Sequence, residues 1–170
     1  MKIAVLGYSG SGKSTLAAQL GELYGVPVLH LDTVHFLPNW EERGLEEKRK
    51  IVSDFLNANA GWIIDGNYLR LFYDERMEQA DMIIILLFGR FACLWRVIKR
   101  YRRYKNKTRP DMSEGCDEKL DGEFIQWVLH DGRTKSKKAV FLALREKYPD
   151  KTVILKNQRQ LDDFIRRSEK

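Results

Sequence analysis

Cysteine is scarce in this sequence, with two residues in 170, Cys93 and Cys116. They lie far apart and form no C-x-x-C pair, so neither a disulfide framework nor a zinc site built on cysteine is indicated. Histidine is scarce as well, and His30, His35 and His130 match no H-E-x-x-H pattern. The composition therefore indicates neither a disulfide-stabilised domain nor a zinc enzyme.

Long apolar runs are also absent. The longest apolar stretch, 82–95, is interrupted by Arg90 and is shorter than the ~20 residues that a membrane-spanning helix needs. The apolar run at 3–6 is too short for a signal peptide. We therefore expect a cytoplasmic protein without a membrane segment. Because no linker, repeat or low-complexity stretch divides the chain, residues 1–170 are expected to form one domain.

What the sequence does contain is a complete G-x-x-x-x-G-K-[ST] motif at residues 7–14. It follows an apolar run and precedes a helical pattern, which is the strand, loop and helix context of a phosphate-binding loop. In such a loop, backbone N–H groups approach the phosphates, Lys13 adds positive charge and the Ser14 hydroxyl can bind Mg²⁺. The alternative is a glycine-rich turn that simply enters a helix. The predicted nucleotide-binding residues are Gly7, Tyr8, Ser9, Gly10, Ser11, Gly12, Lys13, Ser14 and Thr15.

Short apolar segments alternate with helical patterns along the chain, which predicts an α/β fold. The segment 82–88 has no polar alternation, as expected for a parallel strand covered on both faces. Helices are predicted from the loop to Gly25, at 45–59 with the charged run 46–50 in water, and around 67–79. The predicted strands are Lys2 to Leu6, Val26 to Leu31, Trp62 to Asp65, Met82 to Phe88, and Thr152 to Leu155.

Positive charge is concentrated in one part of the chain. The 30 Lys and Arg residues exceed the 24 Asp and Glu residues by six, and residues 96–109 alone hold eight basic side chains and no acidic one. Without those eight, the balance is 22 to 24, a net charge of −2. One local basic patch points to a site for an anionic ligand, although a solvated surface is the alternative.

The same part of the chain predicts an amphipathic helix with one basic face. Lys105 to Gly115, with its turn residues and charges, is predicted to be a mobile loop after that helix. The apolar positions at helical spacing are Phe91, Leu94, Trp95, Ile98 and Tyr101.

Two predicted strands end in aspartate, at Asp32 and Asp65. Ligands of open α/β sheets bind outside the carboxyl ends of the strands, and Mg²⁺ beside a phosphate-binding loop needs an acidic residue there. Either aspartate can instead cap a following helix. The strand at 82–88 is followed by Gly89 and supplies no acid.

Beyond these motifs, the chain resembles the nucleoside-monophosphate kinase group of P-loop proteins, and most closely the adenylate kinase-related chains labelled DNA topology modulation (FlaR-like) proteins. Asp65-Gly66 resembles the Asp-Gly that ends the third strand in adenylate kinases, and Asp32 resembles the acid after the second strand in shikimate-type kinases. The chain departs from the group at 87–90, where Leu-Phe-Gly-Arg stands in place of Leu-Asp-x-Pro. The matching pieces are the P-loop, His30-Leu31-Asp32, Trp40, Trp62 to Tyr68, Arg76, Ala80-Asp81, Arg96, Arg100, Arg109, Gly115 to Glu118, Phe124 and Trp127.

The resemblance implies a three-layer P-loop NTPase fold with a five-stranded parallel sheet in the order 2-3-1-4-5 and a basic lid at residues 100–118. It also implies an ATP-dependent kinase that uses Mg²⁺, with Ser14 and Asp65 as metal ligands and Asp32 on the acceptor side. Charge builds on the phosphoryl oxygens during transfer, and guanidinium groups held there stabilise it. The predicted catalytic residues are Lys13, Arg96, Arg100 and Arg109.

The acceptor is expected to be a small molecule bound between the loop after the second strand and the start of the third helix, and the sequence does not indicate which molecule it is. The alternative function is a nucleic-acid-binding regulator, suggested by the family label and by Tyr101 and Tyr104 among basic residues. The predicted acceptor-site residues are Asp32, His35, Trp40, Asn67, Tyr68 and Arg70.

Overall fold

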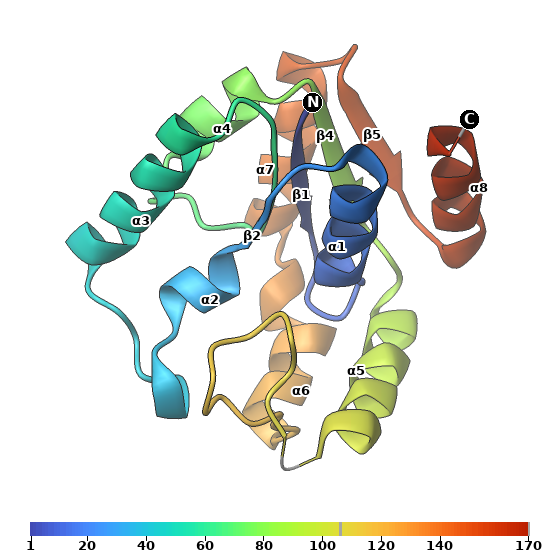
Figure 1. The fold of residues 1–170 in the computed structure, drawn as a ribbon. Helices are drawn as coiled ribbons and strands as arrows, with labels where there is room; N and C mark the ends of the chain where they lie inside the picture. The colour runs from blue at the N-terminus through green and yellow to red at the C-terminus, as the bar shows by residue number, and fades with distance from the viewer. Residues whose placement is uncertain (106, 170) are drawn as a thin grey trace.

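The structure is a computed structural model that describes residues 1–105 and 107–169; Asn106, inside the expected lid, and Lys170 lie outside the described residues. A central parallel sheet has helices on both sides, with α1 (Lys13–Tyr24) in front of it and α7 (Lys135–Lys147) behind it in Figure 1. The sheet has five strands in the order β2-β3-β1-β4-β5, which confirms the predicted fold class. The strands are β1 (Lys2–Gly7), β2 (Val28–His30), β3 (Trp62–Asp65), β4 (Met82–Leu86) and β5 (Thr152–Leu155).

The middle of the sheet forms the core. Ile3 to Leu6 of β1 and Ile83 to Leu86 of β4 are completely buried, as their unbroken apolar sequences require of strands covered on both faces. Val5 pairs with Asp65 and Gly7 with Leu86, so the ends of three strands meet beside the P-loop. The register therefore places Asp65 at the same sheet edge as the loop.

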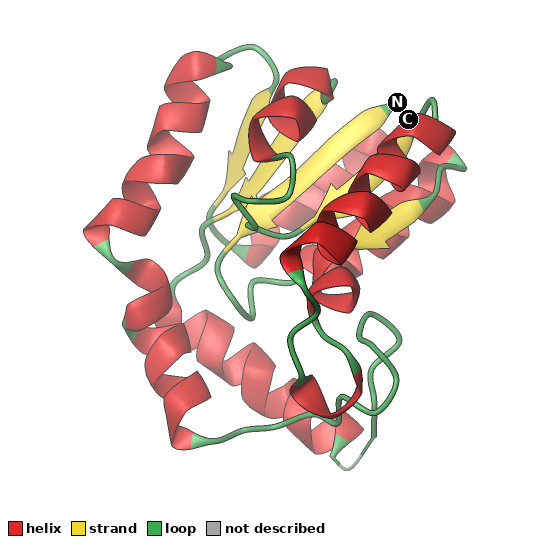
Figure 2. Ribbon diagram, turned by 90° about the vertical axis from the view of Figure 1, so that its left-hand side faces the viewer, coloured by secondary structure: helices red, strands yellow, loops and turns green. Residues whose placement is uncertain are grey.

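The remaining helices cover the sheet and extend beyond its carboxyl edge, where α5, α6 and the loop between them lie apart from the strands (Figures 1 and 2). Within residues 1–105 and 107–169, no helix combines the length and apolarity needed to cross a membrane. These elements are α2 (Leu31–His35), the 3-10 helix η1 (Pro38–Trp40), α3 (Leu45–Ala58), α4 (Tyr73–Gln79), α5 (Arg90–Tyr104), α6 (Gly122–Leu129), the 3-10 helix η2 (Asp131–Arg133) and α8 (Gln158–Ser168).

Three predicted boundaries were wrong. The strand predicted to end at Phe88 ends at Leu86. The second strand is limited to Val28–His30, because the chain turns into the short helix α2 at Leu31. The helix predicted from Asn67 begins only at Tyr73, because residues 66–71 turn around the side chain of Arg76 and give it their carbonyl groups.

Two predicted faces were also wrong. On α5 the exposed fractions of Phe91 and Trp95 are 76% and 62%, whereas the smaller Cys93 and Val97 are completely buried. Lys48 does not lie in water with the rest of its charged run, since it is 7% exposed and its Nζ is 3.0 Å from His35 Nδ1. The helical spacing of residues alone does not determine which side of a helix is buried against the rest of the protein.

The Arg76 side chain is completely buried. Its Nε donates to the Leu71 carbonyl at 2.8 Å, Nη2 donates to the Tyr68 carbonyl at 2.9 Å, and Nη1 lies 3.5 Å from the Gly66 carbonyl. Burial lowers the pKa of this guanidinium to about 10, which leaves it charged at neutral pH. Arg76 thus stabilises the conformation of residues 66–71, the loop that follows Asp65.

Replacing Arg76 with Met is expected to lower the free energy of unfolding by about 3 kcal/mol, because buried carbonyl groups lose their donor. Urea unfolding of the two proteins measures the difference. The matched control is Arg102→Met on the exposed side of α5, which should change stability by less than about 0.5 kcal/mol. Equal effects of the two substitutions would contradict the role assigned to Arg76.

Candidate active site

The P-loop has the backbone that its glycines predict. Gly7 and Gly12 have φ values of 138° and 95°, which side chains rarely tolerate. A Cβ atom on Gly7 would lie 2.3 Å from the Leu86 carbonyl oxygen, so only glycine lets the loop leave the sheet there. Helix α1 then begins at Lys13, which leaves its first N–H groups at the loop for an anion.

The loop side chains are held by neighbours from several elements. Lys13 Nζ donates to the Tyr8 carbonyl at 3.2 Å, within the loop. Ser9 Oγ accepts a hydrogen bond from Trp127 of α6 at 3.1 Å, and the Ser11 carbonyl accepts one from Arg96 Nη1 at 2.7 Å. Lys13 therefore lies against the loop where phosphates bind in such folds.

Ser14 and Asp65 come together, as the register predicts. The Ser14 hydroxyl donates to Asp65 Oδ2 at 2.8 Å, and His30 Nδ1 donates to Asp65 Oδ1 at 2.6 Å. Burial alone would lower the pKa of the His30 ring, but the hydrogen bond to Asp65 and the charges of Asp65, Asp111 and Asp32 together raise it above its ordinary value. The Asp65 carboxylate is 4% exposed and has both oxygens engaged.

A hydroxyl beside a carboxylate is a donor set that suits Mg²⁺, which commonly takes one or two protein ligands and completes its shell with phosphate oxygens and water. In the part of the chain that the structure describes, no three His, Cys, Asp or Glu side chains gather into a metal-binding cluster. Ser14 and Asp65 thus fit a metal ion that arrives with a nucleotide more closely than one held by protein alone.

Asp32 lies in the first turn of α2, directly after β2. Its Oδ1 accepts a hydrogen bond from the Tyr68 hydroxyl at 2.7 Å, and the His35 ring lies 4.8 Å from the Tyr68 ring between centroids. Burial and the adjacent Asp32 charge raise the pKa of Tyr68 far above its ordinary value, so the phenol stays protonated and donates. Burial and the neighbouring Lys48 charge lower the pKa of His35.

The other three predicted acceptor residues, Asn67, Trp40 and Arg70, lie in three different surroundings. Asn67 binds the P-loop strand: its amide accepts from Gly7 N at 3.0 Å and donates to the Gly7 carbonyl at 2.7 Å. Trp40 Nε1 donates to the Asp117 carbonyl at 3.1 Å, which places it against the expected lid. Arg70 is exposed. The structure therefore brings Asp32, His35 and Tyr68 together and places the other three at separate positions.

The two lid arginines share one buried carboxylate. Arg100 Nε and Nη2 each lie 2.7 Å from Glu118 Oε1, and Arg109 Nε lies 2.6 Å from Glu118 Oε2. Arg109 also pairs with Asp111 at 2.9 Å. Glu118 is 5% exposed, and this one buried carboxylate pairs with both guanidinium groups and so orients them.

The expected lid also contacts the segment 31–40, which comprises α2 and η1. Ser113 Oγ donates to the Phe36 carbonyl at 2.5 Å and lies 3.0 Å from the Thr33 carbonyl. Cys116 Sγ lies 3.1 Å from the Leu37 carbonyl. Residues of the segment 33–40, which follows Asp32, therefore contact residues 113–117.

Sequence reasoning assigned no role to several residues that shape this site. In the sequence, Glu118 stands out only as part of the family resemblance. The spacing from Arg100 to Glu118 does not indicate that the two side chains are in contact. Lys48 and Gln158 also carried no signal, because each lies in a run of polar residues. The buried position of its side chain distinguishes Lys48 from its neighbours, and a run of polar residues does not reveal which of them is buried.

The fold and the loop together define a P-loop protein with the strand order expected for P-loop kinases. No family model and no curated protein matches the sequence. Solved structures do match it over nearly its whole length.

A shikimate kinase from Acinetobacter baumannii in complex with shikimate superposes with a TM-score of 0.58 at 20% identity, over 98% of this chain and 89% of that one. A deoxyadenosine kinase from M. mycoides with bound products gives 0.53 at 14% identity, over 98% of both chains. A gluconokinase from Sinorhizobium meliloti 1021 gives 0.51 at 18% identity, over 98% of this chain and 88% of that one. At these identities the likeness establishes the fold.

Proposed function

We propose that this protein is an ATP-dependent phosphotransferase that moves the γ-phosphoryl group to a small-molecule acceptor. The observation that carries the proposal is the contact between the last residue of a complete P-loop and an acid at the end of β3. The Ser14 hydroxyl, next to Lys13, lies 2.8 Å from Asp65 Oδ2. The structural neighbours are named as kinases of small molecules or nucleosides, which supports the same reaction class. Membership of the DNA topology modulation group stays a prediction.

In this proposal the loop N–H groups and Lys13 bind the β- and γ-phosphates. Ser14 and Asp65 hold Mg²⁺, which neutralises charge on the phosphates when it is bound. His30 keeps Asp65 turned toward Ser14 through its hydrogen bond to the other carboxylate oxygen. Arg100 and Arg109 supply positive charge from the lid side, with Glu118 fixing their direction.

Asp32 serves the acceptor. A hydroxyl group that attacks phosphorus must lose its proton, and a carboxylate within hydrogen-bond reach can accept it. Tyr68 holds one oxygen of Asp32 and remains a donor, so the other oxygen is left for an acceptor hydroxyl. The buried Lys48 and the half-buried His35 border this side of the site.

Lys13→Ala is expected to weaken binding of MgATP by tenfold or more, since it removes the full positive charge that faces the phosphates. Because the side chain lies on the loop surface and not in the core, the free energy of unfolding should change little. Calorimetric titration with MgATP measures the affinity, and a panel of nucleoside monophosphates and small hydroxyl compounds, assayed for ADP release, identifies the acceptor. Unchanged affinity in this variant would refute nucleotide binding at the loop.

The nucleic-acid alternative is not favoured by the position of the basic residues. Arg100 and Arg109 are paired with a buried glutamate on the inside of the lid, whereas a duplex-binding surface presents its charges outward to phosphates. Five other basic residues of the stretch 96–109 are exposed, and exposed charge at a helix end and in the segment after it is also ordinary for a solvated surface; they are Lys99, Arg102, Arg103, Lys105 and Lys107.

A further inference from the structure

The first half of the P-loop is contacted by the segment that follows the expected lid. Trp127 of α6 donates its Nε1 hydrogen to Ser9 Oγ at 3.1 Å. Arg133 of η2 lies over the Tyr8 ring, with 4.1 Å between its Cζ atom and the ring centroid. Residues 127–133 therefore hold the loop at two successive positions, although they lie far from the motif in the sequence.

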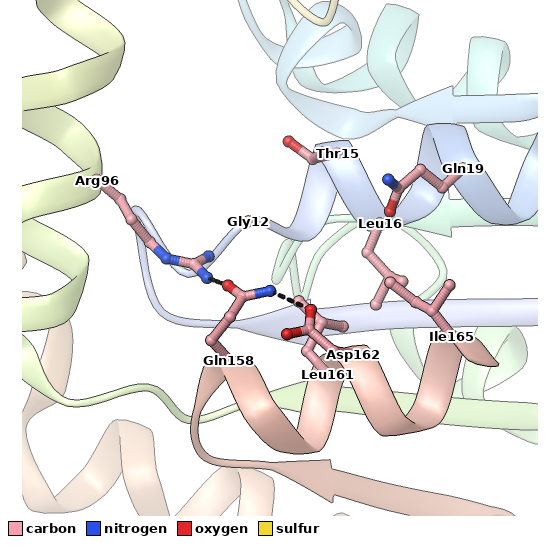
Figure 3. Close-up of a pocket in the computed structure, with 9 residues that line it drawn as sticks. All are labelled: Gly12, Thr15, Leu16, Gln19, Arg96, Gln158, Leu161, Asp162 and Ile165. Atoms are coloured by element: carbon pink, nitrogen blue, oxygen red, sulfur yellow. Dashed lines mark hydrogen bonds between the residues drawn. The ribbon is translucent and has the colours of Figure 1, made fainter. Parts of the chain in front are cut away.

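Ser9 lies at the part of the loop where the terminal phosphates are expected. At Gly12 the loop borders a cleft, beside the guanidinium of Arg96 (Figure 3), whereas Ser9 bonds to α6. Lys13 Nζ, which attracts the β- and γ-phosphates in such loops, donates to the Tyr8 carbonyl at 3.2 Å. That carbonyl belongs to the peptide group that joins Tyr8 to Ser9. A γ-phosphate held by Lys13 therefore lies within reach of the Ser9 side chain.

Trp127 reaches Ser9 from the side of the sheet on which ligands bind. Helix α6 lies beyond the carboxyl edge of the strands (Figures 1 and 2), and open α/β sheets bind their ligands outside that edge. A loop side chain that bonds to α6 points out of the sheet toward this side. The Ser9 hydroxyl is thus directed to the space that the phosphates enter.

The bond also fixes the polarity of the Ser9 hydroxyl. An indole N–H can only donate, so Ser9 Oγ is the acceptor and its own hydrogen points away from Trp127. That hydrogen is available to a second partner that accepts. A phosphate oxygen is such a partner, and hydrogen bonds to a charged acceptor are stronger than those between neutral groups.

The indole of Trp127 is held in place by residues of η2 and α7. Lys137 Nζ lies 3.7 Å from the centroid of the ring and donates to the Asp131 carbonyl at 2.7 Å. A Cβ atom on Gly132 would lie 3.1 Å from Trp127 Nε1 and 2.8 Å from the Trp127 carbonyl oxygen, so glycine leaves room for the ring. Because the side chain is 42% exposed, these contacts orient it more than burial in the core does.

We propose that Trp127 is a positioning residue that turns the Ser9 hydroxyl toward the γ-phosphate. The inference rests on the proposed function, because it concerns the phosphates bound at the P-loop. Ser9 contacts the phosphate, and Trp127 acts through Ser9. The loop thereby gains a hydrogen-bond donor that a nucleoside triphosphate meets and a diphosphate does not.

The test compares the hydrolysis-resistant ATP analogue AMP-PNP with ADP by calorimetric titration in the presence of Mg²⁺. Ser9→Ala should weaken AMP-PNP binding about tenfold and ADP binding less than about twofold, because only the triphosphate places an oxygen beside Ser9. Trp127→Phe keeps an aromatic ring and removes the N–H group. It should weaken AMP-PNP binding about threefold and leave ADP binding unchanged.

The double variant Ser9→Ala/Trp127→Phe separates positioning from a merely structural role. Because Trp127 acts through Ser9, adding Trp127→Phe to Ser9→Ala should cause no further loss of AMP-PNP affinity. If Trp127 only supports the fold, the two losses multiply. Trp95→Phe, on the exposed face of α5, is the matched control and should leave both affinities unchanged.

Three results would overturn the inference: an unchanged ratio of AMP-PNP to ADP affinity in Ser9→Ala, equal losses for both nucleotides in Trp127→Phe, or multiplied losses in the double variant. In each of these cases the proposed function still stands if Lys13→Ala weakens the binding of both nucleotides. If the unmodified protein binds neither nucleotide, the inference and the proposed function fail together.

Discussion

Asp32→Asn is expected to lower kcat by roughly 10²- to 10⁴-fold, the range that loss of a general base produces. The amide keeps the shape of Asp32 but cannot take the proton of an acceptor hydroxyl. Affinity for MgATP should remain close to that of the unmodified protein, because Asp32 lies on α2 and not at the P-loop. Steady-state kinetics with the acceptor identified from the panel, together with calorimetry for MgATP, measure the two quantities.

Tyr68→Phe is the control for this substitution. It removes the hydrogen bond to Asp32 Oδ1 and keeps both the ring and the carboxylate, so kcat should fall much less than in Asp32→Asn. A loss in Tyr68→Phe as large as that in Asp32→Asn would mean that Asp32 matters for the local structure and not as a base.

Arg109→Ala is expected to lower kcat by about 10²- to 10³-fold, or roughly 3 to 4 kcal/mol in activation free energy, if it stabilises charge on the phosphoryl group during transfer. Arg100→Ala should behave in the same way, because both guanidinium groups are oriented by Glu118. MgATP affinity should change little in either variant, since the charge that they stabilise develops during transfer. Pre-steady-state and steady-state rates measure the effect.

Glu118→Gln separates the catalytic role of these arginines from a structural one. Both Arg109→Ala and Glu118→Gln break the buried ion pair, so a merely structural role predicts similar losses of kcat. A catalytic role predicts a smaller loss in Glu118→Gln, because both guanidinium groups remain and the amide oxygen still accepts from one of them, and no loss in Arg102→Ala on the exposed side of α5. Tight duplex binding with a steep salt dependence, insensitive to ATP, would favour the nucleic-acid alternative.

The sheet and the P-loop could be predicted from sequence because their signals are local. An unbroken apolar run such as Met82–Leu86 can only be satisfied by burial on both faces, and the glycines at 7 and 12 occupy positions with positive φ. The strand order came from the resemblance, and the structure confirms it.

The orientation of α5 could not be predicted, because the side of a helix that becomes buried depends on where the helix packs in the fold. Of the predicted apolar stripe, Phe91 and Trp95 face outward and Leu94 packs against the core. Arg96 turns toward the P-loop, and Arg100 toward Glu118 of the expected lid. Burial of charge is unfavourable in general and occurs here because each guanidinium finds a specific acceptor. Those acceptors, Glu118 among them, lie far away in the sequence.

The structure brings some residues of the predicted site together and separates others. Asp65 and Ser14 meet because strand register brings the carboxyl ends of strands together. Asn67 instead bonds to both the N–H and the carbonyl group of Gly7, since the loop after β3 passes beside β1 before α4 begins. The catalytic and binding roles of these residues stay predictions until the variants are measured.

The contact between the lid and the segment 31–40 has a consequence for the order of events during turnover. Ser113 bonds the carbonyl of Phe36 and lies beside that of Thr33, the residue next to Asp32, while Trp40 bonds the lid from the other side. If residues 100–118 act as the lid that the resemblance implies, their opening would break these bonds or move the segment 31–40 with them, while the hydrogen bond from Tyr68 to Asp32 would remain. Under the proposed function, this opening would also displace the contacts around Asp32, so acceptor binding would be coupled to closure of the site.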